Sequence, residues 1–93
     1  DGLGVRRDVA EAAKWYERAA RQGNVVAQSN LGDLHAEGRG VRRDLVEAYV
    51  WLSLAAQQGH RWSEDRRKEI ARAMTDDQIA AADEKVRTWG PAE

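Results

Sequence analysis

One segment of the chain recurs after 36 residues, and this repeat restricts the possible folds more than any other feature. Residues 2–8 read Gly-Leu-Gly-Val-Arg-Arg-Asp, and residues 38–44 read Gly-Arg-Gly-Val-Arg-Arg-Asp. With this offset, 13 of the 23 positions in residues 1–23 are identical to those in residues 37–59, and the match ends after Gly59. A sequence period of about 20 to 50 residues is typical of proteins that stack copies of one supersecondary unit.

The composition indicates that the repeated unit is helical. Ala occurs 16 times, Pro once and Phe never, and the good helix formers Arg, Glu and Leu are common. Residues that favour strands are scarce, so the prediction is an all-α fold. The absence of cysteine excludes disulfides and thiolate metal sites. A formal net charge of −1 argues against a dedicated nucleic-acid binder.

Each copy of the repeat contains the signals of a helix capped at both ends. Asp8 and Asp44 are each followed three residues later by Glu, which is the spacing of a reciprocal N-terminal cap. Gly23 and Gly59 are the expected C-terminal stops. Small and aromatic side chains share one face of each helix, so we expect the tryptophan of each copy to be buried. These face residues are Ala12, Trp15 and Ala19 in the first copy and Ala48, Trp51 and Ala55 in the second.

A second kind of helix is predicted between the two copies. An apolar stripe predicts a helix over residues 25–37, and Gly32 within it is expected to let a neighbouring helix approach closely. Gly38-Arg39-Gly40 predicts a turn after this helix, and residues 2–5 predict the same turn in the first copy. The expected unit is therefore helix, glycine turn, helix, glycine turn.

Residues 60–93 depart from the repeat and predict two more helices. Ser63 is expected to cap the first, and Thr75 with Gln78 has the spacing of a capping box for the second. We expect this pair to close the stack with a face that tolerates water. The apolar side chains that the spacing allows to face inward are Trp62, Ile70, Ala73, Met74, Ile79, Ala82, Val86 and Trp89.

The residue types that carry catalysis are not arranged for it. His35 and His60 lie 25 residues apart, without a His-x-x-x-His pair. The serines lack the flanking residues of a nucleophile motif, and neighbouring carboxylates such as Asp76 and Asp77 point about 100° apart on a helix. We therefore expect no catalytic residue, no metal and no cofactor. We expect His35 to pack between helices and His60 to lie in a solvated turn.

The repeated residues resemble the Sel-one-like repeat family, a bacterial and eukaryotic relative of the tetratricopeptide repeats. The resemblance covers residues 2–59 and implies a right-handed α-solenoid of antiparallel helix pairs, here of bacterial origin. It implies a partial unit over 1–23, a full unit over 24–59 and capping helices over 60–93, at the C-terminal end of a longer array. The matching residues are Ala27, Leu31, Gly32, Gly38, Gly40, Val41, Asp44, Ala48, Trp51, Ala55, Ala56 and Gly59.

The resemblance implies a non-enzymatic scaffold that binds a peptide or protein partner on the concave face of the array. By similarity to tetratricopeptide repeats, the helix over residues 25–37 lines that face. Asp33 and Glu37 make the face mildly acidic and favour a basic partner segment. The implied binding residues are Val26, Ser29, Asn30, Asp33, Ala36 and Glu37.

Other interpretations of the sequence stay open. Arginines around the two Arg-Arg-Asp motifs form either a basic ridge for an acidic partner or solvated loop charges neutralised by nearby acids. The chain is alternatively a self-associating regulatory or assembly module with an open N-terminal edge, or a cell-wall-related hydrolase. Its longest apolar run, Ala48–Ala56, is too short for a membrane span of about 20 residues, and the compartment is open between bacterial envelope and cytoplasm. The candidate ridge consists of Arg6, Arg7, Arg39, Arg42 and Arg43.

Overall fold

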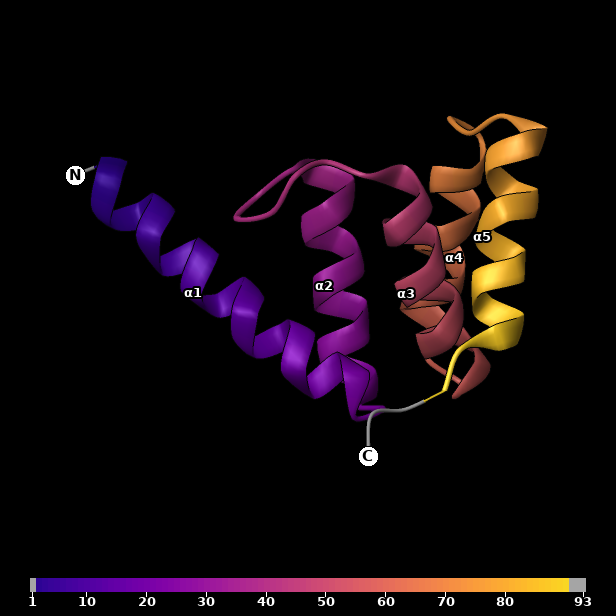
Figure 1. The fold of residues 1–93 in the computed structure, drawn as a ribbon, viewed down its shortest axis with the longest axis horizontal. Helices are drawn as coiled ribbons and strands as arrows, with labels where there is room; N and C mark the ends of the chain where they lie inside the picture. The colour runs from indigo at the N-terminus through magenta and orange to yellow at the C-terminus, as the bar shows by residue number, and fades with distance from the viewer. Residues whose placement is uncertain (1, 91–93) are drawn as a thin grey trace.

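The computed structural model describes the backbone of residues 2–90 and the side chains of residues 8–90. This part of the chain contains five helices and no strand, so the all-α prediction is confirmed. Successive helices from α2 onward run in alternating directions, as the solenoid prediction requires (Figure 1). The helices are α1 (Gly2–Arg21), α2 (Val25–Glu37), α3 (Leu45–Gln57), α4 (Arg61–Ala71) and α5 (Asp76–Thr88).

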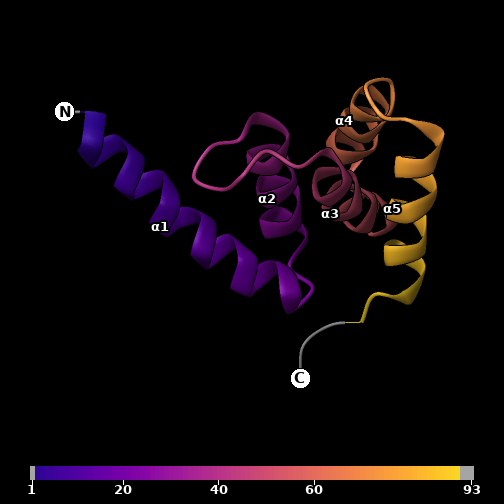
Figure 2. The ribbon, with the colours of Figure 1, turned by 45° about the horizontal axis from the view of Figure 1, so that its top comes forward.

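Helix α3 lies at the centre of the molecule. All eight residues from Ala48 to Ala55 are buried, which is the pattern of a helix covered on every side. Helix α3 packs against α2, α4 and α5. An oblique view shows α3 between α2 on one side and α4 and α5 on the other (Figure 2). The positions of these three helices therefore depend on α3.

Helices α2 and α3 approach closely at Gly32, as the sequence predicts. A Cβ atom on Gly32 would lie 2.7 Å from Cγ of Leu52 and 3.2 Å from the carbonyl oxygen of Ala48. Leu52 is completely buried in the hydrophobic core. Glycine at this position therefore sets the distance between the two helices.

A buried polar cluster joins the ends of α1, α2 and α3. Gln28 is completely buried, and its Nε2 donates to the carbonyl of Ala20 at 3.2 Å. Its Oε1 accepts from Nε2 of Gln58 at 2.9 Å, and the same nitrogen of Gln58 also donates to the carbonyl of Gly23 at 3.2 Å. A buried amide is tolerated here because its donor and its acceptor both have partners.

The helix register continues beyond the point where sequence identity ends. Helix α2 begins at Val25 and α4 begins at Arg61, again 36 residues apart. Helix α5, like α3, begins after a residue whose side chain accepts a hydrogen bond from the third residue along, Asp44 for α3 and Thr75 for α5. At Thr75 the complete capping box is present, as predicted, with the backbone nitrogen of Thr75 donating to Gln78 at 2.8 Å. The start of α4 therefore keeps the 36-residue register, whereas α5 begins 31 residues after α3.

The first copy of the glycine turn differs from the prediction. Residues 2–8 are helical, so α1 begins before Asp8, and Asp8 does not cap it. In the second copy, hydrogen bonds to α2 hold the turn: the Asp44 nitrogen donates to the carbonyl of His35 at 2.9 Å, and Arg43 Nε donates to the carbonyl of Ala36 at 3.3 Å. In the first copy, residues 2–8 form the start of α1 instead.

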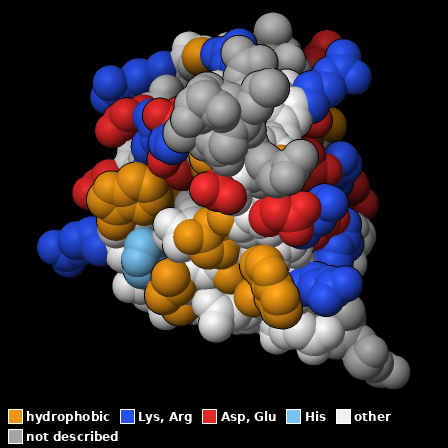
Figure 3. Space-filling model, turned by 90° about the vertical axis from the view of Figure 1, so that its left-hand side faces the viewer, with side chains coloured by type: hydrophobic (Ala, Val, Ile, Leu, Met, Phe, Trp, Pro, Cys, Tyr) orange, Lys and Arg blue, Asp and Glu red, His pale blue; other side chains and the backbone are white. Residues whose placement is uncertain are grey.

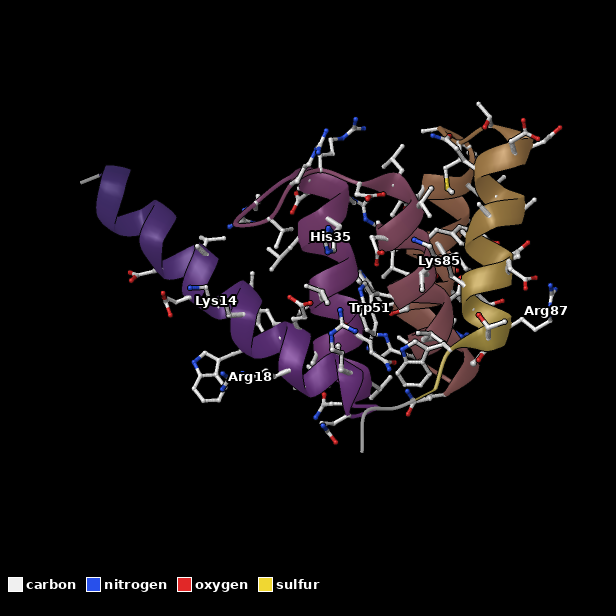
Figure 4. All side chains as sticks on the ribbon, viewed as in Figure 1. Lys14, Arg18, His35, Trp51, Lys85 and Arg87 are labelled. Atoms are coloured by element: carbon white, nitrogen blue, oxygen red, sulfur yellow. The ribbon has the colours of Figure 1, made fainter. Side chains whose placement is uncertain are left out.

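The two repeat tryptophans also differ. Trp51 is buried, 5% exposed, and its ring meets that of Trp89, the residue after α5, edge-on at 6.3 Å. Trp15 is 68% exposed, so the prediction that it is buried is wrong. Helix α1 packs closely against α2 alone among the described helices, and no helix covers Trp15 as α5 covers Trp51. The guanidinium of Arg18 instead stacks on the Trp15 ring at 5.7 Å, on the outer side of α1 (Figure 4).

The start of α4 differs in detail from the prediction. Ser63 lies inside the helix and is completely buried, so it is not the cap. His60 occupies the cap position, and its Nδ1 lies 2.7 Å from the Ser63 hydroxyl. Farther along, Ile70 and Met74 are buried as expected. Trp62, on α4, and Ala73, in the turn after α4, are exposed, so the structure does not place these two side chains in the core.

Replacing Trp51 by Ala should lower the free energy of unfolding by about 3–5 kcal/mol, because the substitution leaves a cavity among packed helices. Trp15→Ala is the matched change at the equivalent position and should cost less than about 1 kcal/mol, because that ring is exposed. Urea unfolding followed by circular dichroism measures both values. Equal losses in the two variants would contradict the placement of the tryptophans.

Replacing Gly32 by Ala should destabilise the protein by about 1–3 kcal/mol through overpacking against Leu52. Helix propensity alone predicts the opposite sign, a gain of about 1 kcal/mol. The additional variant Leu52→Ala removes the obstructing side chain. In a double-mutant cycle, the combined variant should therefore lose less stability than the sum of the single variants. Simple additivity would show that these two side chains do not set the helix distance.

Candidate functional site

The predicted binding helix α2 and helix α4 share a surface built from equivalent positions. We define the α2–α4 face as Val26, Asn30 and Asp33 of α2 together with Trp62, Arg66 and Glu69 of α4. Each residue of α2 in this set lies 36 residues before its counterpart in α4. The face therefore repeats along the array even though its side chains change from one helix to the next.

An ion-pair network joins the two helices across this face. Arg66 Nε lies 3.0 Å from Oδ1 of Asp33, and Arg66 Nη1 lies 3.1 Å from Oε2 of Glu69. Burial lowers the pKa of Arg66, but the hydrogen bonds and charges of Asp33 and then Glu69 outweigh this effect and raise it above its ordinary value. Asp33 therefore has a partner within the protein, and the cluster of three side chains keeps one net negative charge.

Two large hydrophobic side chains lie exposed at one end of the α2–α4 face. Val26 is 58% and Trp62 is 49% exposed. The ring of His60 meets the Trp62 ring edge-on at 6.3 Å, and His60 is itself held by Ser63. Seen from the side of α1, exposed hydrophobic side chains gather in the lower half of the surface beside a histidine, with acidic side chains above them (Figure 3). The apolar end of the α2–α4 face therefore lies next to its charged end.

The other residues that the resemblance implied are spread over different environments. Asn30 and Asp33 line a pocket of about 350 Å³ between α1 and α2. Ser29 is buried, and Ala36 is half-buried against the core. Glu37 is exposed and pairs with Arg39 at 3.6 Å. Val26, Asn30 and Asp33 are therefore the members of the set that lie on the α2–α4 face.

The arginines of the candidate basic ridge have separate local partners where they are described. Arg43 donates to the carbonyl of Ala36, and the carbonyl of Arg42 lies 3.2 Å from Nδ1 of His35. Arg39 pairs with Glu37. The side chains of Arg6 and Arg7 lie outside the described ones. The two Arg-Arg-Asp motifs have different backbones, one helical and one a turn.

Sequence reasoning missed the α4 half of the face. The sequence leaves Trp62 open between core and surface, and it indicates Arg66 only as part of a basic cluster with Arg67 and Lys68. The available signal was the register: a step of 36 residues from Val26 and Asn30 gives Trp62 and Arg66. Identity between the copies had ended, but the spacing had not.

The contact between His60 and Ser63 has the distance of a nucleophile and its base. Such a pair needs access to a substrate carbonyl. Ser63 is completely buried beneath the first turn of α4, and the contact fixes the start of that helix.

Among the helices of residues 2–90, none is long and apolar enough to cross a membrane.

The repeat found in the sequence matches a known family. The family model described as Sel1 repeat matches residues 1–24 and 25–60, which together make up more than half of the chain. Comparison with curated proteins finds no match. Sel1 repeats are generally protein–protein interaction modules and are typically non-catalytic. The two matched units, their 36-residue register and the helical fold lead to one conclusion: the chain belongs to the Sel1 repeat family.

Proposed function

We propose that the chain is a non-enzymatic scaffold that binds an extended segment of a partner protein on the α2–α4 face. The observation that carries this proposal is the exposure of Val26 and Trp62 at equivalent positions of neighbouring helices. Tryptophan is enriched among residues that dominate binding energy at protein interfaces. Its ring supplies a large apolar surface and loses little conformational freedom on binding.

The chemistry of the face defines the partner segment. An apolar side chain of the partner packs between Val26 and Trp62, while the acidic cluster around Arg66 attracts a basic side chain. Val26 and Asp33 lie about 10 Å apart along the α2 axis, at about 1.5 Å per residue. An extended chain covers this distance in about three residues, at roughly 3.3–3.6 Å each. The expected motif is therefore an apolar residue followed or preceded by Lys or Arg three positions away.

The ion-pair network supports this role by keeping the face rigid. Arg66 links α4 to Asp33 of α2, and Glu69 holds the same guanidinium from within α4, so the side chains of the network are ordered before a partner arrives. Preorganisation of this kind lowers the entropic cost of binding. Asn30, half-exposed beside the network, has an amide group that suits hydrogen bonds to a peptide backbone.

Selection of peptides from a random library on the intact chain tests the proposal. The selected peptides should share the apolar–basic motif. Trp62→Ala should weaken their binding about 30-fold, equivalent to about 2 kcal/mol, in isothermal titration calorimetry. Trp15→Ala, the matched change of an exposed tryptophan away from the face, should change the affinity less than twofold.

Two results would contradict the proposal. One is a set of selected peptides that bind Trp62→Ala as tightly as the unaltered chain, with circular dichroism showing that both are folded. The other is a selection that enriches no peptide. The first result would move the binding surface elsewhere, and the second would remove linear peptides as the ligand class.

Self-association is a second candidate, and the open side of α1 favours it. Trp15 projects from a helix that packs closely against one neighbour, and its exposed ring borders a small pocket of about 160 Å³ on α1. If a second copy covers this side, light scattering over a hundredfold concentration range should show a dimer that dissociates on dilution. Trp15→Ala should then shift the midpoint of the monomer–dimer transition to higher protein concentration. A constant monomer mass over the whole range argues against self-association.

A further inference from the structure

A separate pocket of about 330 Å³ lies between α4 and α5 over α3. Tyr49 and Ser53 of α3 form its floor, Arg67 of α4 and Asp83 of α5 form its walls, and Val86 adds an apolar side. Helical spacing puts Arg67 on the side of α4 opposite to the α2–α4 face. This pocket is therefore independent of the surface proposed above for a protein partner.

One floor residue has an unsatisfied hydroxyl. Ser53 is 8% exposed, and its Oγ has no hydrogen-bond partner among the described residues. Leaving a buried hydroxyl unpaired is energetically unfavourable. Buried polar atoms without a partner are uncommon in native proteins. The Ser53 hydroxyl is therefore an unpaired group that lies covered just beneath the pocket.

One wall residue is a cation without an acidic partner. The Arg67 guanidinium lies over the Tyr49 ring at 5.6 Å, and its Nη1 donates to the Tyr49 hydroxyl at 3.4 Å. Among the described residues, no carboxylate oxygen lies within 4 Å of this guanidinium, whereas Arg66, one residue earlier, pairs with two carboxylates. A planar guanidinium matches a carboxylate with two parallel hydrogen bonds.

Two carboxylates border the pocket. Asp83 lies near the Tyr49 hydroxyl; burial first and this carboxylate second raise the pKa of Tyr49 above its ordinary value. Glu64 pairs with Lys68 at 3.8 Å. The free groups that remain are donors, so the pocket suits an acceptor with negative charge. Two nearby carboxylates repel a dianion more strongly than a monoanion, which favours a carboxylate over a phosphate.

We infer that this pocket binds the carboxylate of a ligand with a short apolar group. Arg67 holds the carboxylate oxygens, and the Ser53 hydroxyl donates to one of them when its side chain turns toward the pocket. The Tyr49 ring, Ala56 and Val86 contact the apolar carbons. A branched apolar group of three or four carbons fits beside the polar corner that Arg67 and Ser53 form. This chemistry occurs in a free branched-chain acid and in the C-terminal leucine or valine of a peptide.

Titration of the intact ¹⁵N-labelled chain with two probes distinguishes these sources. The probes are isovalerate and the peptide acetyl-Gly-Gly-Leu, and the control ligand is the same peptide with a C-terminal amide. Binding should shift the Arg67 Nε–H resonance and the amide resonances around Ser53. A response to isovalerate indicates a free acid, a response to the peptide acid indicates a chain terminus, and either supports the inference. The amide should leave both signals unchanged.

Variants then test the two residues. Arg67→Gln should weaken binding of the responding probe at least tenfold, and Ser53→Ala should weaken it about threefold or more. Arg61→Gln removes an exposed arginine from the same helix, outside the pocket, and should leave the affinity unchanged. The inference is overturned if neither probe acid shifts these resonances at a concentration of about 20 mM. Equal binding of the amide, tighter binding of inorganic phosphate, or unchanged affinity in folded Arg67→Gln would also overturn it.

Discussion

The burial of α3 on all sides is the constraint on which the arrangement of the other helices depends. Its apolar surface receives α2 at the Gly32–Leu52 contact, α4 across Ile70, and α5 through the Trp51–Trp89 pair. An ion pair between Lys85 of α5 and Glu47 of α3, at 3.4 Å, adds a polar link near the rim. The α2–α4 face and the pocket beside α5 are both surfaces of helices that α3 positions. A change in its core therefore affects both sites together.

Local signals in the sequence were sufficient to predict the helices that carry their own start and stop residues. Helix α2 has the predicted bounds, and the capping box of Thr75 is present. The same heptapeptide motif, however, forms a turn in one copy and a helix in the other. Trp15 and Trp51 show the same limit, since one identical residue is exposed and the other buried. The helices that pack against each copy decide these cases, and the sequence alone does not show which helices those are.

The candidate site was half predictable for a related reason. The helical face of Val26, Asn30 and Asp33 follows from periodicity and from the resemblance, but burial of Ser29 depends on how closely its neighbours pack. Residue identity between the copies does not reveal the members of the face on α4, which are Trp62, Arg66 and Glu69. Exposed positions of a repeat are free to vary, while the packing positions fix the register. Trp62 and Arg66 occupy the expected places with unexpected side chains, and the salt link from Arg66 to Asp33 follows only from the folded arrangement.

The one-sided packing of α1 divides the protein into parts of unequal local stability. A helix held by a single neighbour opens by local unfolding at lower free energy than one enclosed by three, so amide hydrogens in α1 exchange faster than those in α3. In a linear array, each added neighbour contributes an interface term to the unit beside it. Any molecule that covers the outer side of α1 therefore acts thermodynamically as another repeat, and its binding free energy is coupled to the ordering of that helix.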